Sequence, residues 1–324
     1  MKIFLIVAGV LIGLFLLFTY GGGYYMYRFA TVRNKKQKNY WYDDIAPAKF
    51  LSDEDNQKVM ESWKYLRAQN WQNVSITSYD GHKLAGHYLE HPNPRGLVLQ
   101  IHGYRGCGAF DFSCAVEPFY NAGFSLLIVD QRASGDSEGN HITFGFKERY
   151  DVVDWAKYVE KRFPGLPVVM DGVSMGASTV MLAAGIGYPK NVKAIIADCG
   201  YTSPGDICRK VLKQWFGLPP FPLYYGANFW VKLLAKFDLD GVSCKEALRN
   251  LKGTGIKILI AHGRKDDFVP YHMSEENMKA FDDDEIGDTA VFFTSEEAGH
   301  GMAFLIDREG YMKELDAMFE RAGI

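Results

Sequence analysis

The stretch VVMDGVSMGAS, residues 168–178, decides the fold class of this chain. Its apolar start predicts a buried strand, and the small residues that close it predict a helix packed on that strand. Gly172 and Gly176 stand two residues before and after Ser174, where the lack of a side chain lets a strand and a helix approach closely around a strained turn. This G-x-S-x-G pattern predicts that Ser174 projects above the edge of a sheet, at a helix N-terminus. The alternative is a glycine-rich turn that serves helix packing alone.

Short apolar runs alternate with helical patterns on both sides of this stretch. The runs that we interpret as strands cover residues 97–101, 124–129, 168–170, 194–197, 256–261 and 290–293, and helical patterns lie near 109–122, 147–162, 175–186, 272–281 and 308–321. Two earlier runs, 74–78 and 84–89, flank Asp80-Gly81 and predict a hairpin. This alternation predicts an α/β fold, with a mainly parallel sheet covered by helices on both faces.

The composition divides the chain into three segments. We interpret residues 1–27 as a membrane anchor, 28–70 as a linker that ends in an amphipathic helix over 50–70, and 71–324 as one α/β domain. The amphipathic helix is expected to begin near Ser52. Residues 203–250 interrupt the alternation and are rich in Trp, Phe, Tyr and Pro. Because structureless loops of that length are uncommon, we interpret them as a small helical cap.

An uncharged apolar run covers residues 3–20. As a helix it would reach roughly 27 Å, close to the ~30 Å hydrocarbon core of a bilayer. The run continues into GGGYY without a small-residue cleavage site, which favours an uncleaved single-pass anchor over a cleaved signal peptide or a buried helix. Four tyrosines are then expected at the membrane–water interface: Tyr20, Tyr24, Tyr25 and Tyr27.

Charge is distributed unevenly along the 324 residues, which hold 36 basic and 39 acidic side chains. Residues 1–38 contain basic and no acidic side chains, so the remainder is strongly acidic, which argues against nucleic acid as a partner. The basic segment after the apolar run favours a cytoplasmic body, whereas a short N-terminal anchor often exports the domain attached to it, so the side of the membrane stays open. The five cysteines show no CxxC spacing and are expected to be reduced.

A serine hydroxyl needs a base to take its proton. Three histidines lie after Ser174 in the chain, at positions 262, 272 and 300. His300 lies between glycines after the last predicted strand, so we interpret it as the base, while His262 suits a packed strand end and His272 a solvated helix start. Asp266, just beyond the strand at 256–261, would orient His300, and Asp267 is the rival acid.

Two backbone amides are candidates for holding a negative oxygen. The Met175 amide lies at the predicted helix N-terminus, directly after Ser174. The Tyr104 amide comes after His102-Gly103 at the end of the strand 97–101, where a small residue lets the loop turn toward the serine. We interpret His102 as a structural residue that braces this loop.

Taken together, these motifs resemble the α/β-hydrolase superfamily. The resemblance covers about residues 71–321 and rests on His102-Gly103, DQRASGDSEG at 130–139, the turns at Ser174 and Asp266, and His300, in that order. The stretch TFGFKERYD at 143–151 is similar to bacterial membrane-anchored hydrolases of the serine aminopeptidase-like and feruloyl (cinnamoyl) esterase-like kinds. One departure is Ala133-Ser134, where the family often has Gly-His. Because this loop lines the site entrance, the departure concerns the choice of substrate and not the triad.

The expected function is that of a serine hydrolase that cleaves carboxylic esters through an acyl-enzyme, with Ser174, His300 and Asp266 as its triad. An aminopeptidase or amidase with the same triad, an acyltransferase and an inactive membrane scaffold are the alternatives. The substrate is expected to be a small or lipid-like ester, or a peptide, and the aromatic cap suggests an apolar acyl or aryl group. No cofactor or metal is expected, because the acidic run 282–285 and the histidines at 82, 87 and 91 lack the spacing of calcium and zinc sites.

Overall fold

A computed structural model describes residues 1–36, 38–47 and 51–324. Its centre is an eight-stranded sheet in the order β1-β2-β4-β3-β5-β6-β7-β8. The strands are β1 (Gln72–Thr77), β2 (Lys83–Leu89), β3 (Gly96–Ile101), β4 (Phe124–Val129), β5 (Val168–Val173), β6 (Val192–Asp198), β7 (Lys257–Gly263) and β8 (Ala290–Ser295). The pairs β1–β2 and β2–β4 are antiparallel, and the other neighbours are parallel. The predicted mainly parallel sheet is confirmed.

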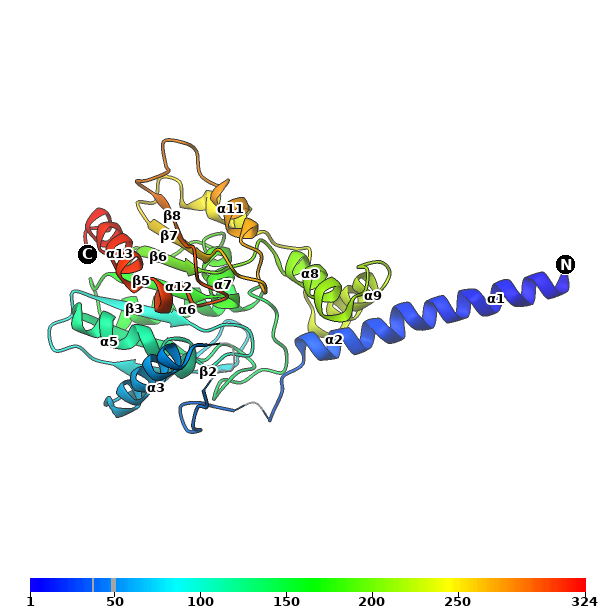
Figure 1. Ribbon diagram of the computed structural model, residues 1–324, viewed down its shortest axis with the longest axis horizontal. Coiled ribbons are helices and arrows are strands. Elements are labelled where there is room, and N and C mark those ends of the chain that lie inside the picture. The colour runs from blue at the N-terminus through cyan, green and yellow to red at the C-terminus, as the bar shows by residue number, and fades with distance from the viewer. Residues whose placement is uncertain (37, 48–50) are drawn as a thin grey trace.

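Helices cover both faces of this sheet, as Figure 1 shows. One apolar core contains side chains of α6 (Glu148–Arg162), α7 (Met175–Ala183) and α10 (Cys244–Leu248), and α11 (His272–Met278) packs beside α10. The opposite core contains side chains of α3 (Asp53–Ala68), α5 (Ser113–Asn121), α12 (Ala303–Ile306) and α13 (Arg308–Ala322). Strands β3 and β4 are buried along their whole length because both of their faces meet such a core.

Local sequence explains most helix ends. The Ser52 hydroxyl accepts from the Asp55 amide at 3.0 Å and begins α3 as expected, whereas Phe50 lies outside the described residues. The helical pattern near 109–122 is two helices, α4 (Gly108–Asp111) and α5, because Phe112 leaves the helical backbone region. The four-residue α12 is too short to produce a periodic signal in the sequence.

The N-terminal segment is one long rod that projects away from the sheet (Figure 1). It consists of α1 (Lys2–Leu16), the π-helical η1 (Leu17–Gly22) and α2 (Gly23–Thr31). This rod has a mean hydropathy of 2.7 in its most apolar window and is long enough to cross a membrane, a property shared by anchors and signal sequences. The interfacial position expected for Tyr27 is wrong. Its ring is 4% exposed and its hydroxyl hydrogen-bonds His141 at 2.7 Å, because α2 packs on the α/β domain.

The region 203–250 is helical, as predicted. It contains α8 (Pro204–Phe216), α9 (Leu223–Trp230), the π-helical η2 (Val231–Ala235), α10 and a 3-10 turn, η3 (Arg249–Leu251). Helix α8 begins with a Ser203 cap and Pro204 in its first turn, and it ends at Gly217 in the left-handed conformation. Helices α8 and α9 share a third apolar cluster with α2, so the cap and the N-terminal rod form one unit above the sheet.

Candidate active site

Ser174 occupies the sharp turn between β5 and α7. Its backbone has φ 55° and ψ −115°, a conformation that costs a non-glycine residue about 1–3 kcal/mol. A Cβ on Gly172 would lie 2.4 Å from backbone atoms of Gly176, and a Cβ on Gly176 would lie 1.8 Å from the carbonyl oxygen of Ile101. Glycine is therefore required at both positions, and the turn points the serine hydroxyl away from the sheet.

A chain of hydrogen bonds joins three side chains from three loops. His300 Nε2 lies 2.9 Å from Ser174 Oγ, and His300 Nδ1 lies 2.7 Å from Asp266 Oδ2. Asp266 lies just after β7 and His300 after β8, so both are at the carboxyl edge of the sheet beside the turn after β5. Asp267 is exposed, and its backbone carbonyl accepts from Lys210 and Gln214.

Asp266 is held by more partners than His300 alone. Its Oδ1 accepts from the amides of Phe268 and Val269 at 2.9 and 2.8 Å, and its Oδ2 also lies 3.0 Å from His262 Nε2. Burial by itself would raise the pKa of this carboxyl, but hydrogen bonds with His262 and His300 hold the pKa well below its usual range. Asp266 is therefore ionised at neutral pH.

His262 is fully buried and positions the acid. Its Nε2 faces two acceptors, Asp266 Oδ2 and the Val269 carbonyl, so the proton lies on Nε2, and Nδ1 accepts from the Ser274 hydroxyl at 2.7 Å. The sequence prediction of a packed strand-end histidine agrees with this burial. The bond from His262 to Asp266 is a finding of the structure that the sequence pattern does not predict.

The loop after β3, which contains Gly103 and Tyr104, passes beside Ser174. A Cβ on Gly103 would lie 3.4 Å from Ser174 Cβ, so the loop passes close to the hydroxyl. The Gly103 amide donates to Asp111 Oδ2 at 2.8 Å, and His102 accepts from the Gln131 amide through Nε2 at 3.0 Å. Burial lowers the pKa of His102 to about 4, so this histidine is neutral and braces the loop.

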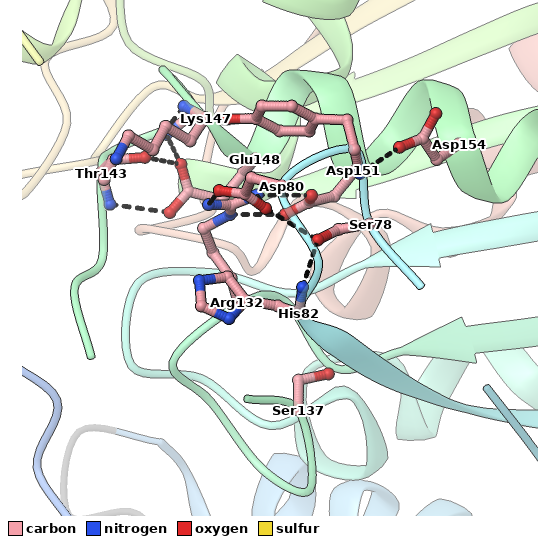
Figure 2. A network of polar contacts seen from close by, with 12 residues as sticks. Ser78, Asp80, His82, Arg132, Ser137, Thr143, Lys147, Glu148, Asp151 and Asp154 are labelled. Atoms are coloured by element: carbon pink, nitrogen blue, oxygen red, sulfur yellow. Dashed lines mark hydrogen bonds and ion pairs between the residues drawn. The ribbon is translucent and has the colours of Figure 1, made fainter. Parts of the chain in front are cut away.

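Arg132 lies at the centre of a buried polar network (Figure 2). Its Nε and Nη2 donate to the two oxygens of Asp151 at 2.6 Å each, and Nη1 donates to Asp80 at 2.9 Å. Burial alone would lower the pKa of the guanidinium, but Asp151 and Asp80 raise it well above its usual value. The network ties the loop 130–139 to α6 and to the β1–β2 hairpin at the edge of the sheet.

We expect Arg132→Met to lower the free energy of unfolding by about 3–5 kcal/mol, because it leaves the Asp151 carboxylate buried without its counter-charge. The measurement is urea unfolding of the full chain in detergent, monitored by tryptophan fluorescence. Arg249→Met is the control, since its pair with Glu246 is exposed and is worth at most about 1 kcal/mol. Equal losses in the two variants would contradict the role given to Arg132.

Two cavities meet at Ser174. The first is apolar and lies between α2, α8 and α9; it is lined among others by Met26, Phe29, Ala30, Val211, Trp215 and Ala227. The second lies toward α4, α5 and α12 and contains His300, the buried carboxyls of Asp171 and Asp198 and the half-buried carboxyl of Asp111. Burial raises the pKa of Asp111 to about 6 and that of Asp171 to about 7, and it raises the pKa of Asp198 as well.

Two side-chain clusters have metal-ligand atoms within 4.8 Å of one another: Cys199 with Asp266 and His300, and His87 with Asp130 and Asp136. In the first, burial raises the pKa of the Cys199 thiol well above its usual value, which disfavours the thiolate that metals need. In the second, Asp136 already accepts from the Tyr42 hydroxyl at 2.8 Å. We assign neither cluster a metal, and the expectation of none stays a prediction.

The fold is similar to that of several solved structures. The Pyrococcus furiosus esterase Pf2001 superposes with a TM-score of 0.62 at 19% identity, over 80% of this chain and 94% of that one. The α/β hydrolase GrgF from Penicillium sp. sh18 gives a TM-score of 0.61 at 14% identity, over 79% of this chain and 100% of that one. The strand order and the strained turn at Ser174 are consistent with the fold that these structural similarities indicate.

The chain has the α/β-hydrolase fold. The family model described as serine aminopeptidase, S33, matches residues 92–220. An uncharacterized protein of Bacillus subtilis, YqkD, is 24% identical over 247 residues, which are 76% of this chain and 78% of that protein. These matches support a hydrolase, and they leave the bond that this α/β hydrolase cleaves to be argued from its site.

Several residues of this α/β hydrolase site carry no signal in the sequence. Asp111 holds the Gly103 amide, and His262 holds Asp266, yet both positions look like ordinary turn or strand residues in the sequence. Helix α2 lines the apolar cavity although its composition is that of an anchor and linker. The one available signal is the run of glycines at 21–23, which is unusual at the end of an anchor and marks close helix packing.

Proposed function

We propose that this α/β hydrolase cleaves carboxylic esters through an acyl-enzyme, with Ser174 as nucleophile, His300 as base and Asp266 as the acid that orients His300. The observation that carries the proposal is the hydrogen-bonded chain from Asp266 through His300 to a serine in a strained turn. The arrangement meets the geometric requirement for activating a serine, since nucleophile and base lie within hydrogen-bond reach.

In the proposed reaction, Ser174 Oγ attacks the ester carbonyl carbon while His300 Nε2 takes the hydroxyl proton. The amides of Met175 and Tyr104 donate to the oxygen that becomes negative. His300 then gives its proton to the departing alcohol, which leaves an ester on Ser174. A water molecule, deprotonated by His300, attacks this acyl group, and the carboxylic acid departs as the serine regains its proton.

An aminopeptidase with the same triad is the second candidate, because the matching family model carries that description and three carboxyls line the second cavity. A free α-ammonium group needs an ionised carboxylate beside it. Burial raises the pKa of Asp171 to about 7 and also raises the pKa of Asp198, which weakens their charge at neutral pH, and Asp111 Oδ2 already accepts from the Gly103 amide. This effect favours a substrate without a free ammonium group, and therefore the ester.

One assay distinguishes the esterase from the aminopeptidase. We expect p-nitrophenyl butyrate to be hydrolysed with a kcat/KM at least about tenfold above that of leucine p-nitroanilide. Because anilides are intrinsically slower, the second comparison is between leucine p-nitroanilide and its N-acetyl derivative. An aminopeptidase requires the free amine, so a strong preference for the unacetylated anilide would overturn the ester proposal.

We also propose that the N-terminal rod stays attached as a single-pass anchor. The support is that residues ahead of α2 pack on the cap: Phe15 lies near Phe221, and the Tyr20 carbonyl accepts from the Trp230 indole at 2.7 Å. Cleavage near residues 21–25 would remove both contacts. Intact mass of the chain purified from membranes tests the proposal, and a mature chain that begins after residue 20 would contradict it.

A further inference from the structure

Three helices enclose an apolar slot that ends at Ser174. Helix α2 forms one wall with Met26, Phe29 and Ala30, and α8 and α9 form the others. The exposed rim includes Phe29, whose ring meets that of Phe216 edge-on at 5.6 Å, and Trp215, which is 55% exposed. The side chains of these three walls offer the slot hydrocarbon and aromatic surface rather than charge, which suits an aliphatic chain.

Helix α9 is apolar on both faces, and its continuation η2 adds apolar residues and the exposed Lys232. The inward face is buried and consists of Leu223, Tyr224, Ala227 and Val231. The outward face repeats every four residues and is 45–63% exposed: Phe221, Tyr225, Phe229 and Leu233. A helix that is apolar all round is normally buried in protein or in lipid, and this outward face stays about half exposed even though Phe221 and Phe229 touch the rod.

The position of α9 along the rod identifies what covers its outward face. Phe221 packs near Phe15 with ring centroids 6.1 Å apart, and Phe229 packs on Tyr20 at 5.3 Å. Helix α9 therefore runs parallel to the rod, and Phe221, two residues before the start of α9, lies level with Phe15. That level is five residues, about 7.5 Å, inside the apolar run that ends at Tyr20. If the rod spans a bilayer, the outward face of α9 lies in the same leaflet.

Close packing holds α9 against the rod. A Cβ on Gly226 would lie 1.9 Å from the Thr19 carbonyl oxygen, and a Cβ on Gly23 would lie 2.4 Å from the backbone of Gly226. The Trp230 indole donates to the Tyr20 carbonyl at 2.7 Å. Small residues that let two backbones touch are a common device for helix contacts in membranes. The slot between α2 and α9 therefore keeps a fixed position relative to the leaflet.

We propose that the substrate is a bilayer-resident lipid ester whose long acyl chain occupies the slot between α2, α8 and α9, with the cap immersed in the leaflet. The inference rests on the proposed ester hydrolysis by Ser174 and adds the substrate class to it. The acyl chain leaves the leaflet beside α9, its carbonyl carbon reaches Ser174 Oγ, and the alcohol group departs through the second cavity. Hydrolysis by water yields a fatty acid and the free alcohol.

The first test narrows the slot. Full-length protein in phosphatidylcholine vesicles is assayed with 4-methylumbelliferyl palmitate and butyrate. We expect Ala30→Phe to lower the ratio of kcat/KM for palmitate over butyrate at least tenfold, because lost contact with about two methylene groups suffices for that effect. Ala8→Phe, the same change on the rod outside the slot, should keep the wild-type ratio. An equal ratio in the two variants would overturn the proposal.

The second test leaves the slot intact and alters the outward face of α9. Tyr225→Asp combined with Phe221→Asp adds charge at residues that are 58% and 63% exposed. We expect palmitate hydrolysis in vesicles to fall at least about tenfold relative to butyrate, since charge at this depth opposes immersion of the cap. Ile186→Asp, at a residue 39% exposed outside the cap, is the control. An unchanged ratio in the double variant would show that the cap does not enter the leaflet.

Labelling by a fluorophosphonate probe distinguishes failure of the lipid-substrate proposal from failure of the ester-hydrolase proposal. The lipid substrate is refuted, and the ester proposal stands, if the probe labels Ser174 and butyrate is cleaved but palmitate is not preferred. The same conclusion requires that neither Ala30→Phe nor the double aspartate variant changes the palmitate-over-butyrate ratio of kcat/KM. If no probe adduct forms and no ester of any chain length is cleaved, the proposed function itself fails.

Discussion

Replacing Ser174 with alanine is expected to abolish ester hydrolysis, with kcat falling by a factor on the order of 10⁴–10⁶. The alanine variant keeps the turn and the hydrogen bond between His300 and Asp266, but it removes the oxygen that forms the acyl-enzyme. The measurement is hydrolysis of p-nitrophenyl butyrate by the full chain in detergent. Ser75→Ala, at an exposed position on β1, is the matched control and should retain wild-type activity.

The hydrogen-bonded chain also predicts how the effects combine. His300→Ala should cost about as much as Ser174→Ala, and the double variant should cost little more, because the serine is unreactive without its base. Losses that multiply would instead indicate that the two side chains act in separate steps. Undiminished turnover in the Ser174→Ala variant would contradict the assignment outright.

Replacing Asp266 with asparagine is expected to lower kcat on the order of 10⁴-fold, because the amide no longer holds the His300 tautomer that accepts the serine proton. Asp267→Asn is the control, since Asp267 is exposed and lies beside the same turn. A large loss for Asp267→Asn with a small one for Asp266→Asn would transfer the role to the rival acid. Kinetics of p-nitrophenyl butyrate hydrolysis measure both variants.

The same substitution has a defined pH signature in stability. The pKa of Asp266 lies well below its unfolded value, so its ionised form stabilises the folded chain above the unfolded pKa near ~3.9. That contribution is lost only as the pH falls through the lower folded pKa. The Asp266→Asn variant should therefore be less stable than wild type at neutral pH, and the difference should shrink in acid. Urea unfolding at several pH values measures it.

The sequence indicates the sheet, the serine turn and the three side chains beside it because each depends on short-range patterns. Strands that alternate with helices, and glycines two residues either side of Ser174, are read from neighbouring positions. The order of Ser174, Asp266 and His300 is then explained by where parallel strands end. The choice of Asp266 over Asp267 stays open in the sequence, because only the fold determines which of two adjacent carboxyls turns inward.

The role of the N-terminal rod cannot be predicted from the sequence, because an apolar run looks the same whether lipid or protein covers it. The pattern of tyrosines places Tyr27 at the membrane interface, yet it is buried on His141 because α2 continues onto the cap. Likewise, His262 supports Asp266 through a contact that forms only when β7 and its loop are folded. Tertiary contacts of this kind join residues far apart in the chain, so no local sequence pattern predicts them.

Peptide mapping of a fluorophosphonate adduct on the full-length protein tests the central claim most directly. The account predicts one covalent adduct per chain, on the peptide that contains Ser174, formed rapidly by wild type and at least about a hundredfold more slowly by the His300→Ala variant. An adduct on another residue, or labelling of Ser174 that does not depend on His300, would contradict it.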